Sequence, residues 1–373
     1  MPTADDLRSL ALHEPAQPVL TVYARTDARD PANTNHVPGW LIALRNGLRA
    51  VDDPSRHPQL PALVERVERE ARALAPSERG RSFAWFVTPD GALDRRFPLQ
   101  IPLSDDLVVL DDRPFISPLV EVVDRGSAAE LVLVGSETIR LLRWQQGSVT
   151  EPENSTWEMS LGDWRDYQGP AAAGQHTATH AEHFDARVDE SRRRFFESVG
   201  ASLATRFEAQ GTDRVVIAGE GRMTRDFADC LSTWARERVI DVIDSNVNDG
   251  VPSDIGRVLE PRLEAHWRQE AAAAAAATAE SARGGGPAAL GPDETLASLV
   301  QARVGRLFLD PGCDYAMADL GPQSRQAFDD RRDERIAEVA VELAIAGGAR
   351  VTAVDSSVPA VAEAGGMLAQ LRY

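Results

Sequence analysis

The sequence predicts an α/β protein built from three domains. Its 373 residues exceed what one hydrophobic core usually organises. Short runs of β-branched and apolar residues alternate with segments of helical period along most of the chain, which indicates βαβ units. The prolines between 114 and 118, and Pro252, separate three such groups. We therefore expect an N-terminal α/β domain over 1–127, a middle domain over 128–247 and a C-terminal domain over 248–373.

The first domain shows three strands and two helices. Amphipathic periodicity predicts the helices, and β-branched or aromatic runs predict the strands. The turn pair Asp90-Gly91 predicts a hairpin between the last two strands. The expected elements are strands at 18–23, 82–87 and 93–99, and helices at 40–51 and 60–74.

The middle domain begins with two strands joined by a short turn at 135–137. Residues 148–180 show little periodicity and predict a long loop, which in a compact domain is usually functional or disordered. The segment Gly219-Glu220-Gly221 superficially resembles a dinucleotide-binding loop, but Thr224 stands where the third glycine belongs, so we favour a strand-to-helix turn. The expected elements are strands at 130–134, 138–144, 214–218 and 239–243, and helices at 184–209 and 225–237.

The C-terminal domain opens with one long helix over 253–283, although Pro261 lies inside it and warns of a kink. Its Ala271–Ala277 run is of low complexity and strongly helix-forming. We expect helices at 295–302 and 331–346, strands at 306–309 and 351–354, and a final edge strand at 368–373.

Charge and composition narrow the class of protein. The net charge of −18 opposes non-specific nucleic-acid binding, so any RNA contact must come from a local basic patch. All 40 of the Lys and Arg residues are arginine. No apolar run approaches a membrane span, the N-terminus lacks a signal peptide, and two cysteines support no disulfide framework. We expect a cytoplasmic protein without a cofactor.

The most informative stretch is the small-residue segment 169–176, which ends in Gly174-Gln175-His176 ahead of a helix carrying Arg192, Arg193 and Arg194. Glycine allows close backbone approach. A Gln amide can orient water, or the backbone N–H of the Gln can stabilise an oxyanion, and both are useful for ester hydrolysis. Taken alone, the Gly-Gln pair occurs at chance frequency, and a plain surface loop is the alternative. The aromatic residues Trp157, Trp164 and Tyr167 either stack on bases or anchor the loop to its domain.

A second hypothesis uses some of the same residues. His176, His180 and His183 are spaced i, i+4, i+7 and could face one way on a helix, as zinc ligands do. This would indicate a metal-dependent hydrolase unrelated to translation. The alternative is a solvated polar helix start.

The order of the three domains and several C-terminal segments resemble the archaeo-eukaryotic class-I peptide chain release factors and their bacterial relatives, which are related to the Vms-type peptidyl-tRNA hydrolases. The resemblance covers about residues 128 to 373 and is most specific at the C-terminal end. The segments that carry it are Ala173-Gly174-Gln175, 290–299, 303–309, 347–351 and 365–373.

The resemblance implies a ribonuclease-H-like mixed sheet in the middle domain and an α/β/α sandwich, similar to kink-turn RNA-binding ribosomal proteins, at the C-terminus. It implies catalytic roles for Gly174 and Gln175. The RNA contacts that it implies are Ala173, His176, Arg192, Arg193 and Arg194. The expected partners are ribosomal RNA and tRNA at the A site and a translational GTPase such as EF-Tu, with no membrane and no DNA.

Two departures from the family shape the expected function. Ala173 replaces the first glycine of the family's Gly-Gly-Gln tripeptide, and alanine does not freely adopt positive φ. The stop-codon motif Asn-Ile-Lys-Ser is absent. The resemblance therefore implies a factor that binds stalled or idle ribosomes, in rescue or hibernation, with peptidyl-tRNA hydrolysis as an open activity.

Overall fold

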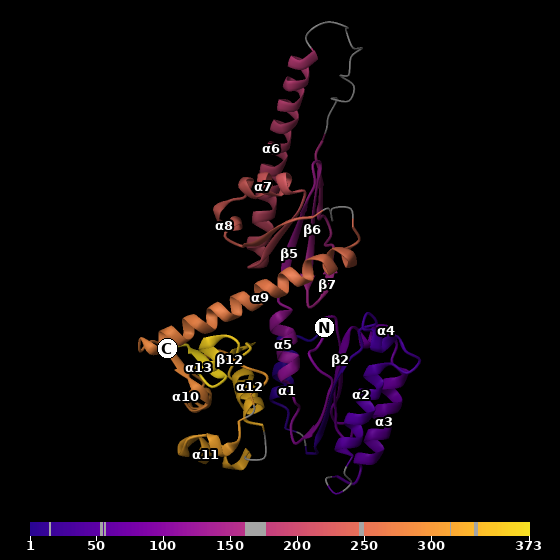
Figure 1. Cartoon of the computed structure of the whole chain (residues 1–373), viewed down its shortest axis with the longest axis vertical. Helices are drawn as coiled ribbons and strands as arrows, with labels where there is room; N and C mark the ends of the chain where they lie inside the picture. Colours follow the sequence, from indigo (N-terminus) through magenta and orange to yellow (C-terminus); the bar gives the residue numbers. More distant parts are fainter. Residues whose placement is uncertain are drawn as a thin grey trace. The chain divides into compact units, whose positions relative to one another are not determined.

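The computed structural model describes residues 1–14, 16–52, 55, 57–160, 177–245, 250–313, 315–331 and 335–373, with the backbone alone for 177–186 and 330. The described chain is α/β and holds three sheets, one in each predicted domain (Figure 1). It folds into two compact units: Met1–Ser127 with Glu264–Tyr373, and Ala128–Leu263. The α/β fold class is thereby confirmed, whereas the three domain boundaries stay a prediction. Across these described ranges no helix is long and apolar enough to span a membrane.

The first unit contains an antiparallel sheet in the order β3-β2-β1-β4. The helices α2 and α3 pack their apolar faces on it around Trp40, Leu44 and Trp85, because their buried positions recur with helical period. The predicted strands and helices are confirmed, and β4, α1 and α5 are additional. The bounds are α1 Ala4–Ala11, β1 Val19–Arg25, η1 Pro31–Thr34, α2 Gly39–Val51, α3 Leu60–Ala73, α4 Pro76–Arg79, β2 Ser82–Val87, β3 Asp94–Leu99, β4 Leu107–Asp111 and α5 Ser117–Arg125.

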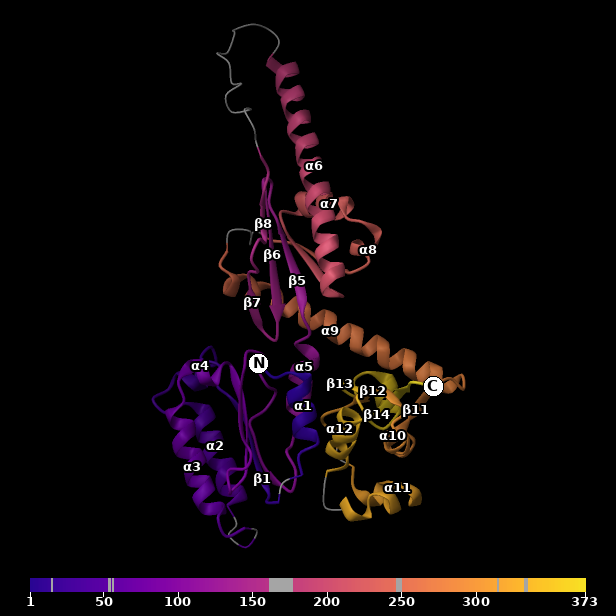
Figure 2. The same cartoon turned by 180° about the vertical axis from the view of Figure 1, so that it is seen from behind.

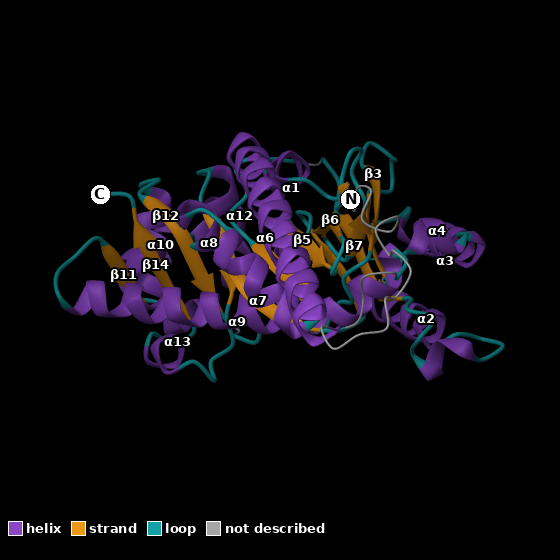
Figure 3. Cartoon of the chain, turned by 90° about the horizontal axis from the view of Figure 1, so that it is seen from above, coloured by secondary structure: helices purple, strands orange, loops and turns teal. Residues whose placement is uncertain are grey.

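The same unit contains a second sheet in the order β11-β14-β12-β13, whose first three strands lie side by side in Figure 3. The strand predicted at 368–373 is present as β14, but its predicted position at an edge is wrong. Strand β14 pairs with both β11 and β12, and Leu368 and Ala369 are fully buried. The bounds are β11 Ala288–Leu290, α10 Gly291–Val300, β12 Val304–Leu309, η3 Met317–Asp319, α11 Pro322–Ala327, η4 Asp329–Arg331, α12 Ile336–Ala346, β13 Arg350–Ala353, α13 Pro359–Glu363 and β14 Met367–Leu371.

One long helix, α9, covers Pro252–Arg283, as predicted, and continues through Pro261. Its alanine run is one-sided. Ala271, Ala275 and Ala279 are buried in a cluster with Phe308 and Val361, while Ala273 and Ala277 are exposed. Small side chains every four residues let the helix backbone approach its neighbours closely.

The second unit contains a mixed sheet in the order β10-β9-β5-β6-β7, with β8 also paired to β6 (Figure 2). Strands β5, β9 and β10 are parallel, and β6 is antiparallel to β5. The bounds are β5 Ala129–Val134, β6 Thr138–Gln145, β7 Ser148–Thr150, β8 Thr156–Glu158, α6 Thr177–Gln210, β9 Val215–Gly219, α7 Gly221–Cys230, α8 Thr233–Arg236 and β10 Val239–Asp244.

The loop predicted at 148–180 is wrong at both of its ends. Strands β7 and β8 occupy its first part, and α6 begins at Thr177. Each of the two strands has three residues, too few to show an alternating pattern. Trp157 of β8 packs against the core of the unit, so it anchors this segment rather than offering a free stacking surface. Trp164 and Tyr167 lie outside the described residues.

Candidate functional site

Helix α6 begins two residues after Gln175 and therefore carries the candidate segment at its N-terminal end. Ala173, Gly174, Gln175 and His176 themselves lie outside the described residues. The side chains of His180 and His183 do so as well, so the zinc hypothesis stays a prediction. In the part of the chain that is described, no cluster of three or more His, Cys, Asp or Glu side chains could hold a metal ion.

Only the C-terminal part of α6 packs on its sheet. Phe196, Val199, Leu203 and Phe207 repeat with helical spacing and are buried with residues of β5, β6, β9 and α7. None of the described side chains from 187 to 195 is buried.

Among the described side chains of α6, which begin at Arg187, Phe196 is the first that is buried. Residues 177–195, which we call the stalk, extend for about 28 Å at 1.5 Å per residue. Figures 1 and 2 show α6 running well past the ends of the strands on which it packs. The N-terminal end of α6 therefore lies away from the core of its own unit.

Ion pairs join charged side chains along the described part of the stalk. Arg193 bonds Glu190 at 3.0 Å and Glu197 at 2.5 Å, and Arg194 bonds Glu190 at 2.8 Å. The hydrogen bond from Arg193 is the main reason that the pKa of Glu190 lies below its ordinary value. Each exposed pair at this spacing contributes only about 0.3–0.5 kcal/mol, so the set supports helix formation without rigidifying it strongly.

The three predicted RNA-contact arginines differ in direction. Arg193 and Arg194 are exposed, with 55% and 74% of their side-chain surface accessible. Arg192 is only 17% accessible. Its Nε donates to the carbonyl oxygen of Ser136 at 3.1 Å, and its Nη1 donates to Asp189 Oδ1 at 2.9 Å. The structure therefore places two of the three guanidinium groups where a phosphate could meet them.

A shallow depression of about 450 Å³ lies where β9 and β10 end, and Glu220, Gly221, Arg222 and Asp244 are among its lining residues. Gly219-Glu220-Gly221 forms the predicted strand-to-helix turn, since β9 ends at Gly219 and α7 begins at Gly221. The carboxylate of Asp244 accepts a hydrogen bond from the Gly221 N–H at 3.1 Å. This negative charge lies at the N-terminus of α7, where a dinucleotide phosphate would otherwise bind, and so opposes phosphate.

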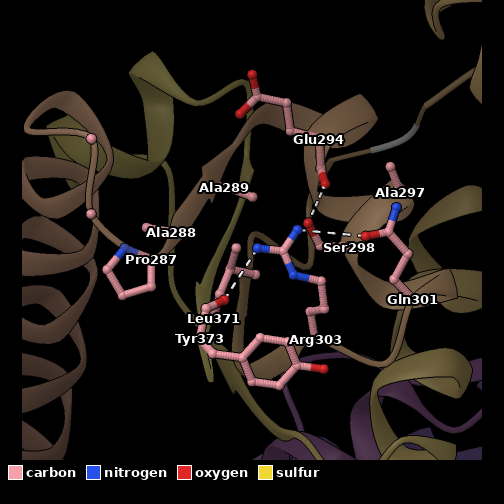
Figure 4. A pocket seen from close by; sticks show the side chains of 12 residues that line it. Pro287, Ala288, Ala289, Glu294, Ala297, Ser298, Gln301, Arg303, Leu371 and Tyr373 are labelled. Atoms are coloured by element: carbon pink, nitrogen blue, oxygen red, sulfur yellow. Dashed lines mark hydrogen bonds between the residues drawn. The ribbon is translucent and has the colours of Figure 1, made fainter.

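A larger open depression of about 700 Å³ lies beside β11 in the first unit (Figure 4). Its polar groups mostly bond to one another: Arg303 donates to the Tyr373 carbonyl oxygen at 3.1 Å and reaches Gln301 Oε1 at 3.5 Å. Ser298 Oγ donates to the Glu294 carbonyl oxygen at 2.8 Å. The side chains that line it hold no nucleophile bonded to a base, so the depression offers no hydrolytic chemistry.

Three residues around Arg192 were not predicted: its acceptors Ser136 and Asp189, and Arg222, which faces Asp189. Asp189 Oδ2 lies 3.8 Å from Arg222 Nη2. The i, i+3 spacing of Asp189 and Arg192 is a signal that the sequence did contain. Ser136 and Arg222 come from other elements, and no sequence spacing indicates them.

Comparison with protein families matches residues 114–266 to the model of bacterial archaeo-eukaryotic release factor family 10. The match covers all of the second unit and includes the stalk. The uncharacterized protein YocB of Bacillus subtilis (strain 168) is 22% identical over 240 residues, which are 63% of this chain and 88% of that protein.

Similar solved structures include archaeal factors of translation. Archaeoglobus fulgidus Pelota is 13% identical with a TM-score of 0.37, covering 100% of this chain and 92% of that one. A model of ribosome-bound archaeal Pelota and ABCE1 matches at 14% identity with a TM-score of 0.41, covering 100% and 94%. The archaeal translation termination factor aRF1 matches at 15% identity with a TM-score of 0.28, covering 99% and 96%.

Proposed function

We propose that this chain, a bacterial relative of the archaeo-eukaryotic release factors, enters the A site of stalled or idle ribosomes and presents Ala173-Gly174-Gln175 to the peptidyl-transferase centre. The observation that carries the proposal is the stalk. A reaction centre enclosed by RNA can be reached only by a narrow projection. Helix α6 extends about 28 Å beyond the core of its unit. The candidate tripeptide comes directly before this projection in the chain.

The charge of the stalk suits this task better than the charge of the whole chain. The net charge of −18 works against close approach to RNA over a broad surface. The stalk has four acidic and four basic residues, so 4 − 4 leaves it formally neutral. Those residues are Glu182, Asp185, Asp189 and Glu190, and Arg187, Arg192, Arg193 and Arg194. A neutral projection meets less electrostatic repulsion from RNA than the acidic body does.

Arg193 and Arg194 are the residues best placed for phosphate contact, because their guanidinium groups are exposed. Their present partners Glu190 and Glu197 are also solvent-accessible, so exchange for an RNA phosphate costs little desolvation. Such contacts position a protein on RNA without reading its sequence. This fits a factor that lacks a stop-codon motif and acts in rescue or hibernation, with a translational GTPase such as EF-Tu as a candidate for delivery.

Hydrolysis at the tip would need few groups. Water adds to the ester carbonyl carbon of peptidyl-tRNA, the bond to the ribose oxygen breaks, and that oxygen takes up a proton. Gln175 would orient the water or stabilise the oxyanion through its backbone N–H. Gly174 still precedes Gln175 and keeps the backbone freedom of glycine, which Ala173 lacks.

Sedimentation of lysates from growing and starved cells through sucrose gradients tests ribosome binding. We expect the protein to travel with ribosomal particles, most strongly after starvation. A protein that stays at the top of both gradients would refute the proposal.

Peptide release from purified stalled ribosomes tests the catalytic part. Gln175→Ala removes the side-chain amide that would orient the water but keeps the backbone N–H. We expect it to slow release by about 10²-fold, the order of loss that follows a 1 Å misplacement of a reacting group. Gln323→Ala, an exposed glutamine on α11, is the matched control and should release normally. If the wild-type protein binds ribosomes but releases no peptide, it acts by occupying the site and the hydrolytic part fails.

A further inference from the structure

Three elements of the second unit meet where the stalk leaves the sheet. Arg192 of α6 donates from Nε to the carbonyl oxygen of Ser136, in the turn between β5 and β6, at 3.1 Å. Its Nη1 donates to Asp189 at 2.9 Å, and the other oxygen of that carboxylate lies 3.8 Å from Arg222 of α7. The chain of contacts therefore ties α6 to the β5–β6 turn and to α7.

Arg192 lies on the sheet-facing side of α6, near the point where the helix leaves its core. It lies one turn ahead of Phe196, which is fully buried, and so shares a face with it. The low accessibility of its side chain, 17% against 74% for Arg194, agrees with this inward direction. The planar guanidinium can serve two acceptors from different nitrogens, which one ammonium does less well.

We propose that Arg192 is a positioning residue, which with Asp189 and Arg222 clamps the root of the stalk and sets the direction in which α6 leaves the sheet. The functional consequence rests on the proposed role of the stalk, but the mechanical claim stands without it. Arg192 then acts through geometry, whereas Arg193 and Arg194 act through charge.

The length of the stalk makes its root direction important. A change of about 10° at the root of a lever of about 28 Å moves the tip by about 5 Å. A misplacement of 1 Å at a reaction centre can already cost about 10²-fold in rate. The angle at the root of the stalk therefore affects the position of the tip more than any single contact along the exposed helix does.

Spin-label distance measurements test the clamp without ribosomes. Cys230 and Cys313 are first changed to serine, and labels are placed at Thr179→Cys on the stalk and Thr150→Cys on β7. We expect Arg192→Ala to widen the distance distribution at least twofold. Arg194→Ala, which breaks an exposed pair of the same helix, should leave the width unchanged. Equal widths in the wild type and Arg192→Ala would overturn the proposal.

Asp189→Ala separates a positioning role from a charge role, because the two roles predict different results. If Arg192 and its neighbours served RNA affinity alone, removal of the Asp189 carboxylate would tighten ribosome binding. The clamp predicts a wider distance distribution and a release rate at least tenfold lower. Arg192→Lys adds a second test: it keeps the charge, but we expect it to restore only part of the narrow distribution.

The two proposals fail in different ways. A narrow wild-type distribution that widens in Arg192→Ala, in a protein that never binds ribosomes, would support the clamp and refute the function. Ribosome-dependent release with equal widths in all variants would support the function and refute the clamp.

Discussion

Glu338 of α12 caps the N-terminus of α5 by accepting hydrogen bonds from Ser117, a residue 221 positions earlier in the chain. The same carboxylate accepts from the Ile116 N–H. Ile116, the residue at the N-cap position, has no side-chain oxygen with which to cap the helix. A carboxylate from another helix therefore satisfies the free N–H groups and complements the positive end of the helix dipole.

This cap should make the stability of the first unit pH-dependent. Burial, and to a smaller extent the like charge of Glu342, raise the pKa of Glu338 to about 7 despite the hydrogen bonds that it accepts. Arg331 and Arg113 face Glu342 from the other side, and the Tyr23 hydroxyl is buried nearby. Because the folded pKa is raised, the stabilisation is complete below pH 4.5 and is lost as the pH rises through 7.

The measurement is the free energy of unfolding from urea titrations at pH 5 and pH 8.5. We expect the wild type to lose about 2.5 kcal/mol more across this window than Glu338→Gln, which cannot ionise. Glu363→Gln, at an exposed glutamate, should behave like the wild type. A pH slope unchanged in Glu338→Gln would contradict the prediction.

The alanine face of α9 should tolerate no enlargement. Ala275 is fully buried against the core that includes Phe308 and Leu368, so Ala275→Leu forces the helix away from its neighbours. We expect a loss of about 1–3 kcal/mol in the free energy of unfolding, measured in urea. Ala277→Leu makes the same change at an exposed position two residues away and should cost less than about 0.5 kcal/mol. Equal losses in both variants would show that the face is not packed as described.

The exposed arginines of the stalk should set the salt dependence of ribosome binding. Changing Arg193 and Arg194 together to glutamine removes two candidate phosphate contacts. We expect the slope of log affinity against log salt to become shallower by about one to two. A variant with Arg257→Gln and Arg268→Gln, two exposed arginines of α9, should keep the wild-type slope. Quantitative pelleting with ribosomes at several salt concentrations measures the slopes of both variants. Identical slopes would show that Arg193 and Arg194 do not contact the ribosomal RNA.

Local patterns predicted most of the regular elements because their signals lie within one segment. The β-branched run of β1, the amphipathic period of α3 and the alanine-rich α9 each specify their own conformation. The short strands β7 and β8 were not predicted, because three residues are too few to show an alternating pattern. The position of β14 inside its sheet escaped for another reason: strand order depends on pairing with residues distant in the chain.

The sequence by itself determined the α/β class, the long helices and the presence of Ala173-Gly174-Gln175 just ahead of an arginine-bearing helix. Tertiary structure decided how far α6 extends beyond its core, which way Arg192 points, and that Glu338 caps α5. Periodicity and composition act between neighbours in the chain, so a single sequence displays them. Burial and hydrogen bonding across 56 or 221 positions exist only once the sheets have assembled.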